Sequence, residues 1–235
     1  MTHGEADYDV IVVGAGIGGI YAVHRFTQQG LSVLGIEGAS GVGGVWYHNR
    51  YPGARVDVDS IDYCYYFSAE VWQQWRWTER FAAQPEILAY LDFVADRFGV
   101  KQRFVFGTWV TSAQWRGDTV RYHVTTSTGL SVSCRFLVMA TGQLSAARRP
   151  EFPGLERFRG EWVRTSHWPE HGADLDGRRI GIIGTGSSGV QAIPVLAQHA
   201  RHLHVFQRTA NYVVPARTAP IGAAVQRGIA DRLGD

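Results

Sequence analysis

The chain has 235 residues, of which 45% are hydrophobic, 12% aromatic and 19% charged, and this composition excludes a disordered protein. The formal net charge of +2 argues against a protein that binds nucleic acid by bulk electrostatics. No apolar run approaches the roughly 18 residues that a membrane span needs. We therefore expect a cytoplasmic protein with neither a nucleic-acid nor a membrane partner.

The first predicted elements are a strand, a glycine-rich turn, a helix and a second strand. Residues 8–13 hold a continuous β-branched run, which is typical of a strand buried on both faces. Apolar residues repeat at helical spacing from Ile20 to Phe26, and residues 31–37 indicate the next strand. Together they predict a β-α-β unit of about 30 residues.

The middle of the chain has a mixed pattern. Residues 38–62 are rich in Gly, Arg and aromatic residues and indicate a loop, whereas residues 85–98 carry the apolar stripe of a helix. Short β-rich pieces between Phe104 and Met139 predict a small antiparallel meander, which leads into a turn at Gly142. We expect this meander to belong to the same domain as the first β-α-β unit.

A second β-α-β unit follows a Pro- and Gly-containing linker. Its strands are predicted at residues 179–183 and 202–206, with a glycine-rich turn and a helix between them. Residues 216–235 form a tail without a strand signal.

The predicted fold class is therefore α/β, with two Rossmann-like dinucleotide-binding domains. The expected boundaries are 1–150 for the first domain, 151–215 for the linker and second domain, and 216–235 for the tail. Because two strands and one helix cannot bury both faces of a sheet, we expect both domains to be incomplete. The chain is then either the front portion of a longer protein or is completed by a second chain.

The first glycine-rich turn has the features of a dinucleotide site. Gly14 allows a tight turn, Gly16 lets a pyrophosphate approach the backbone, and Gly19 allows close contact between helix and strand. The start of the helix offers N–H groups to the phosphate. Glu37, 23 residues after Gly14, can accept hydrogen bonds from ribose hydroxyls.

The second turn differs at the position that discriminates between nucleotides. Gly184, Gly186 and Gly189 repeat the glycine pattern, but Arg208 lies 24 residues after Gly184 and is followed by Thr209. A guanidinium and a hydroxyl bind a 2′-phosphate, which a carboxylate would repel. The second site is therefore predicted to take NADPH, and two unlike sites imply a flavin that accepts hydride from NADPH.

The two cysteines, Cys64 and Cys134, lie too far apart in sequence to form a paired redox motif. We expect both to be reduced, small apolar residues of the interior. Thiol relay chemistry is therefore not expected, and oxygen is the predicted electron acceptor.

Three stretches resemble the flavoprotein Baeyer–Villiger monooxygenases: Gly41–Tyr47, Asn49–Arg55 with Asp57, and Phe158–Pro169. The resemblance extends from about Tyr8 to Pro220. It implies FAD in the first site, NADPH in the second, and the conversion of a small-molecule ketone with O2 to an ester or lactone. An N- or S-oxygenating flavin monooxygenase is an alternative, as is a non-catalytic fragment or one subunit of a split enzyme.

The resemblance also implies roles for particular residues. Those placed at FAD are Gly18, Glu37, Val45, Trp46, Asp57, Tyr63 and Val110. Those placed between the cofactors are Arg55, Val56, Asp57 and Gln143. Those placed at NADPH are Gly184, Thr185, Gly186, Ser187, Ser188, Gly189, Val190, Arg208 and Thr209. Asp57 is the implied catalytic residue, because its carboxylate could hold and orient a cation beside the flavin.

Two departures from the family pattern bear on activity. Arg164 stands where the family carries a histidine, which is expected to disturb the coupling between cofactors more than their binding. The family's catalytic arginine is not matched within these 235 residues. The isolated chain is therefore expected to turn over slowly or not at all.

Overall fold

The computed structural model describes residues 6–146 and 150–226. The chain divides into two compact units, which are described separately. Unit 1 comprises Met1–Tyr47 and Leu91–Pro150, and unit 2 comprises His48–Tyr90 and Glu151–Asp235. Residues 48–90 thus belong to the same unit as the second β-α-β segment. The expected domain boundaries at residues 150 and 215 remain a prediction.

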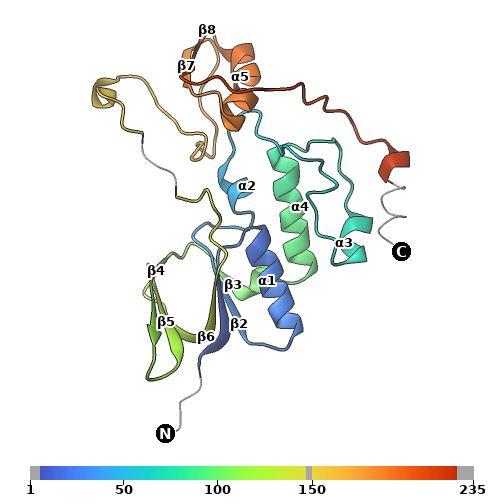
Figure 1. Cartoon of the computed structure of the whole chain (residues 1–235), viewed down its shortest axis with the longest axis vertical. Helices are drawn as coiled ribbons and strands as arrows, with labels where there is room; N and C mark the ends of the chain where they lie inside the picture. Colours follow the sequence, from blue (N-terminus) through green and yellow to red (C-terminus); the bar gives the residue numbers. More distant parts are fainter. Residues whose placement is uncertain (1–5, 147–149, 227–235) are drawn as a thin grey trace. The chain divides into compact units, whose positions relative to one another are not determined.

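Unit 1 is built on a mixed six-stranded sheet with the order β3-β2-β1-β6-β5-β4. The strands are β1 (Tyr8–Val13), β2 (Val33–Ile36), β3 (Phe104–Val105), β4 (Val110–Arg116), β5 (Arg121–Thr126) and β6 (Ser131–Met139). β3, β2, β1 and β6 pair in parallel, whereas β6, β5 and β4 pair antiparallel. The predicted meander is therefore confirmed, and Figure 1 shows it continuing the sheet.

The helices of unit 1 are α1 (Ile17–Gln28) and α2 (Val45–His48), which ends just across the unit boundary. α4 (Gln84–Arg97) spans the boundary between the units in sequence, and a short 3-10 helix, η1 (Lys101–Arg103), follows it. The prediction of a loop over residues 38–62 was wrong at α2, because one helical turn is too short to show a periodic apolar pattern.

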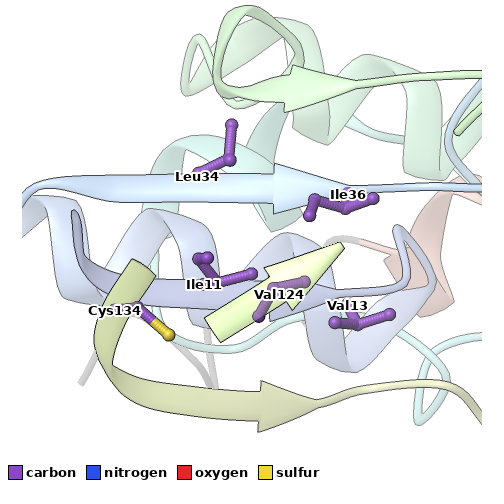
Figure 2. Close-up of a cluster of buried hydrophobic side chains, with 6 residues drawn as sticks. All are labelled: Ile11, Val13, Leu34, Ile36, Val124 and Cys134. Carbon is purple, nitrogen blue, oxygen red and sulfur yellow. The ribbon is translucent and has the colours of Figure 1, made fainter. Parts of the chain in front are cut away.

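The core of unit 1 lies on both faces of the sheet. Figure 2 shows one face, where side chains from β1, β2, β5 and β6 meet: Ile11, Val13, Leu34, Ile36, Val124 and Cys134. Val10 and Val12 of β1 are fully buried as well. The continuous burial of β1 confirms the prediction from its unbroken apolar run.

Unit 2 contains a parallel pair of strands, β7 (Arg179–Ile183) and β8 (His202–Phe206), connected by α5 (Ser187–His199). Its other helical elements include α3 (Ala69–Gln74) and the 3-10 turn η2 (Leu155–Arg157). The two strands have the predicted bounds. Figure 1 shows the β7-α5-β8 segment of this unit.

The core of unit 2 joins this segment to the loop that begins at His48. The buried residues are Tyr51, Ala54, Ala192 and Leu196, from the loop and from α5. Partly buried Trp168 and Leu203 pack against them. The loop is thus a structural part of unit 2.

The described part of the predicted tail is bonded to residues 78–80. The Arg80 N–H donates to the Ala219 carbonyl (2.9 Å), and the Ile221 N–H donates to the Thr78 carbonyl (3.0 Å). Pro220 forms an isolated antiparallel bridge with Glu79. None of the described helices is both long and apolar enough to cross a membrane.

Candidate functional site: two glycine-rich turns and an arginine loop

The first turn is shaped by glycines whose backbone has no room for a side chain. Gly14 has a φ of +104°, and an added Cβ would lie 2.5 Å from the Ala140 carbonyl oxygen. A Cβ on Gly19 would overlap the Gly14 carbonyl oxygen. The Gly14 N–H donates to the Ile36 carbonyl (2.8 Å). β1, α1 and β2 therefore meet at one tight corner, as the spacing of the glycines predicts.

The opening of this turn is left clear. Gly16, the residue before α1, has φ −77° and ψ −171°, and the first turn of α1 carries no acidic residue. A Cβ on Gly18 would meet no atom within 4 Å. The first turn of α1 itself therefore presents no acidic side chain to an anion at its start.

Glu37 follows β2 and points back to the turn. Its Oε2 accepts the Ala15 N–H (2.5 Å), and its Oε1 accepts the Ala39 N–H (2.7 Å). The residue is 8% exposed. Because each carboxylate oxygen has a second lone pair, both can still accept a hydrogen bond from a ribose hydroxyl. The structure thus places Glu37 at the mouth of the first turn.

The other unit 1 residues implied at a cofactor lie on short segments. Val45 and Trp46 are in α2, which begins directly after Gly43 and Gly44. Val110 is partly buried at the start of β4. Gln143 is exposed after β6. Their contacts with a cofactor remain a prediction.

The second turn repeats the first in local geometry. Gly184 has a φ of +101°, and a Cβ on Gly189 would overlap the Gly184 carbonyl oxygen. The Gly184 N–H donates to the Phe206 carbonyl at 2.9 Å. Gly186 precedes α5 with φ −71° and ψ −177°. Two turns 170 residues apart (184 − 14) therefore build the same kind of tight strand-to-helix corner.

The residue that corresponds to Glu37 in the second turn is Gln207. Both lie 23 residues after the first glycine of their turn (37 − 14 and 207 − 184). Glu37 contacts Ala15, the residue after Gly14, and the Gln207 side chain donates from Nε2 to Oγ1 of Thr185, the residue after Gly184 (2.8 Å). The sequence prediction counted to Arg208 and missed Gln207, although the equal spacing could have identified it.

A neutral amide therefore occupies the position of the carboxylate. Arg208 and Thr209 come next and are exposed. Asn211 also holds the turn, because its Nδ2 donates to the Thr185 carbonyl (2.7 Å). The donors shown at the turn are the two amides, and the Arg208 guanidinium directly follows Gln207 in sequence.

The loop that carries Arg55, Val56 and Asp57 belongs to unit 2. The Arg55 guanidinium donates from Nη1 to Glu79 Oε2 (3.2 Å) and to the Phe81 carbonyl (3.3 Å). Val56 is buried, whereas Asp57 is exposed. Within the described residues Asp57 forms no ion pair, so its carboxylate is open to a cation.

The remaining members of the predicted set in unit 2 are less constrained. Tyr63 is partly buried, Ser187 is exposed, and Ser188 and Val190 are partly buried at the start of α5. Arg164 is partly buried, and its carbonyl accepts the His167 N–H (3.0 Å). The consequence of Arg164 at the histidine position stays a prediction.

Both cysteines are free thiols. Burial raises the pKa of Cys64 to about 11, and burial also raises the pKa of Cys134 to about 11. Cys134 is fully buried in the unit 1 core, and Cys64 is partly buried. A thiolate nucleophile is therefore disfavoured at neutral pH.

Comparison with known proteins points to flavoproteins. Residues 8–233 match the family described as pyridine nucleotide-disulphide oxidoreductase. A Baeyer-Villiger monooxygenase from Pseudooceanicola batsensis is 47% identical over 216 residues, covering 92% of this chain and 39% of that protein. A phenazine N-monooxygenase from Lysobacter antibioticus is 44% identical over 225 residues, covering 95% of this chain and 41% of that protein.

Solved structures give the same result. The crystal structure of OTEMO in complex with FAD and NADP has a TM-score of 0.92 and 41% identity, covering 98% of this chain and 44% of that chain. The α/β fold class and the resemblance to Baeyer–Villiger monooxygenases are therefore confirmed. The chain spans 39% to 41% of the length of the two curated relatives described above.

Proposed function

Because the chain belongs to the pyridine nucleotide-disulphide oxidoreductase family, we propose that it binds FAD at the first glycine-rich turn and NADPH at the second. We further propose that it serves an NADPH- and O2-dependent oxidation of a small-molecule ketone to an ester or lactone. The observation that carries the proposal is the repeated turn, with Glu37 at one copy and Gln207 followed by Arg208 at the other.

Bound FAD would supply the redox chemistry, by accepting hydride from NADPH and passing electrons to oxygen. The residues of this chain would bind and orient the two nucleotides. Glu37 would hold ribose hydroxyls, and the N–H groups at the start of α1 would hold a pyrophosphate. Gln207, Arg208 and Thr209 would hold the 2′-phosphate of NADPH.

The arginine loop would contribute charge near the reacting groups. Asp57 is exposed and offers a carboxylate that can orient a cation. Arg55 is anchored by an ion pair with Glu79. Its guanidinium is therefore fixed in direction, because Nη1 donates to both the Glu79 carboxylate and the Phe81 carbonyl.

Anaerobic reduction of bound flavin tests the cofactor assignment. The chain is purified, loaded with FAD and mixed with NADPH or NADH, and the loss of the yellow flavin absorbance is followed. We expect NADPH to reduce the flavin and NADH to do so much more slowly. Failure to retain FAD, or equal rates with both nucleotides, would contradict the proposal.

A second candidate function is N-oxygenation, which the phenazine N-monooxygenase relative favours. Product analysis separates the two, with a cyclic ketone and a heteroaromatic amine offered in parallel under air. Ester or lactone formation that depends on NADPH supports ketone oxidation. An N-oxide without any ester would support the second candidate. Mass detection is needed because turnover by this chain alone is expected to be low.

A further inference from the structure

One side-chain amide holds the loop that carries Arg55. The Gln191 Oε1 accepts the Tyr51 hydroxyl (2.8 Å) and the Arg55 backbone N–H (3.3 Å). The Gln191 Nε2 donates to the Arg55 carbonyl (3.1 Å). Both lone pairs of the amide oxygen are thus used. The two residues are joined across 136 positions of sequence (191 − 55).

The backbone of the loop also approaches α5 closely. Gly53 has a φ of +82°, and an added Cβ would overlap the Gln191 carbonyl oxygen. Tyr51 and Ala54, on either side of Gly53, are 8% and 5% exposed and pack on α5. Gln191 therefore bonds to a loop that backbone contact and side-chain packing already hold in one position on α5.

The same helix begins at the second glycine-rich turn. Gln191 lies two residues after Gly189 and in the second turn of α5. Ser188 lies in the first turn of α5 and is one of the groups that affect the pKa of Tyr51. Burial raises the pKa of Tyr51, the Ser188 hydroxyl opposes that rise, and the negative charge of Asp57 adds to it. Tyr51 is therefore close to both the turn and Asp57.

We propose that Gln191 and Tyr51 are positioning residues that transmit nucleotide occupancy of the second turn to Arg55 and Asp57. This inference rests on the proposed function, because it takes NADPH to be the occupant of that turn. A nucleotide phosphate at the start of α5 orders Ser188 and the adjoining backbone. Tyr51 and Gln191 connect this part of α5 to the loop through their hydrogen bonds. The loop is therefore held more firmly when the nucleotide is bound.

Thermodynamic linkage relates the effect of NADP+ on the loop to the effect of the loop on NADP+ affinity. If NADP+ stabilises the seated loop by some factor, then release of the loop must weaken NADP+ binding by the same factor. We expect a factor of about 10, within the range of roughly 5 to 150 that is usual for coupled sites. Hydrogen exchange of the amides in residues 53–57 measures the first quantity, and calorimetric NADP+ titration measures the second.

The experiment compares the wild type with Gln191→Ala, Tyr51→Phe and the control Gln198→Ala, an exposed glutamine on the same helix. In the wild type and the control, NADP+ slows exchange in the loop about tenfold. In Gln191→Ala, the Arg55 amide exchanges fast without nucleotide, NADP+ does not slow it, and NADP+ binds about tenfold more weakly. In Tyr51→Phe, the Arg55 amide stays protected without nucleotide, but the response to NADP+ is lost.

The outcomes separate this inference from the proposed function. If NADP+ binds the wild type, and slows loop exchange in Gln191→Ala and in Tyr51→Phe as much as it does in the wild type, the positioning role is refuted. If Gln191→Ala does not fold, Tyr51→Phe decides the question, because it keeps both bonds between Gln191 and Arg55. If NADP+ does not bind the wild type, the proposed function is refuted, and so is the coupling, because it requires NADP+ in the second turn. The anchoring of Arg55 is still decided by exchange without nucleotide.

Discussion

Two glycines of the second turn allow nucleotide binding to be separated from folding. A Cβ on Gly186 would meet no atom within 4 Å, and its φ of −71° is open to any residue. A Cβ on Gly189 would overlap the Gly184 carbonyl oxygen. We therefore predict that Gly186→Ala leaves stability nearly unchanged but weakens NADP+ binding, whereas Gly189→Ala destabilises unit 2.

The magnitudes follow from the two environments. Alanine at the residue before a helix costs about 0.5–1 kcal/mol relative to a capping residue, and the lower entropy of the unfolded chain returns about 0.4–1 kcal/mol. The net change in the free energy of unfolding for Gly186→Ala is therefore within about 0.5 kcal/mol. For Gly189→Ala, a clash with backbone lowers the free energy of unfolding by about 3 kcal/mol. The higher helix propensity of alanine raises it by about 1 kcal/mol. A net loss of about 2 kcal/mol remains.

The assay pairs urea unfolding with calorimetric NADP+ titration. The methyl group of Gly186→Ala lies where the pyrophosphate must approach, so binding should weaken by about 1–3 kcal/mol, or roughly 5- to 150-fold. Unchanged NADP+ affinity in Gly186→Ala would refute the assignment of this turn to the phosphate. Wild-type stability in Gly189→Ala would refute the close approach of α5 to β7.

Three further predictions concern single side chains. Glu37→Gln should lower the free energy of unfolding of unit 1 by about 1–3 kcal/mol and abolish FAD retention, because an amide donor would face the Ala15 or Ala39 N–H; retained FAD and unchanged urea unfolding would contradict this. Gln207→Glu should weaken NADP+ more than NAD+, since a carboxylate repels the 2′-phosphate; calorimetry with both nucleotides would show equal effects if the position is unimportant. Because burial raises the pKa of both cysteines to about 11, only about 0.1% of each is thiolate at pH 8. Reaction with a thiol reagent should therefore be slow when folded, speed up as the pH rises toward that pKa, and become fast in denaturant; fast reaction of the folded chain at pH 8 would contradict the burial.

The two β-α-β units could be predicted well because their signals are local. β7 contains three isoleucines, β8 contains Leu203, Val205 and Phe206, and the bounds of both strands were identified correctly. Glu37 could likewise be placed at the first turn, because its spacing from Gly14 is fixed by one strand, one helix and one short connection. α2 was missed because its pattern spans a single turn.

The surroundings of the arginine loop could not be predicted, because they depend on contacts distant in sequence. The bonds of Gln191 to Arg55 and Tyr51 join segments more than 130 residues apart (191 − 55 and 191 − 51). No local pattern of hydrophobicity encodes such a pair. The anchoring of Pro220 beside Glu79 is of the same kind, and the sequence indicated only a tail without a strand signal there.

We propose that one chain binds two different dinucleotides, FAD and NADPH, at two turns of similar geometry. The most direct test of this proposal is a pair of calorimetric titrations, one with FAD and one with NADP+ on the FAD-loaded chain. The account predicts one FAD and one NADP+ bound per chain at the same time, with NAD+ binding much more weakly than NADP+. Mutual displacement of FAD and NADP+, or a single shared stoichiometry, would contradict it.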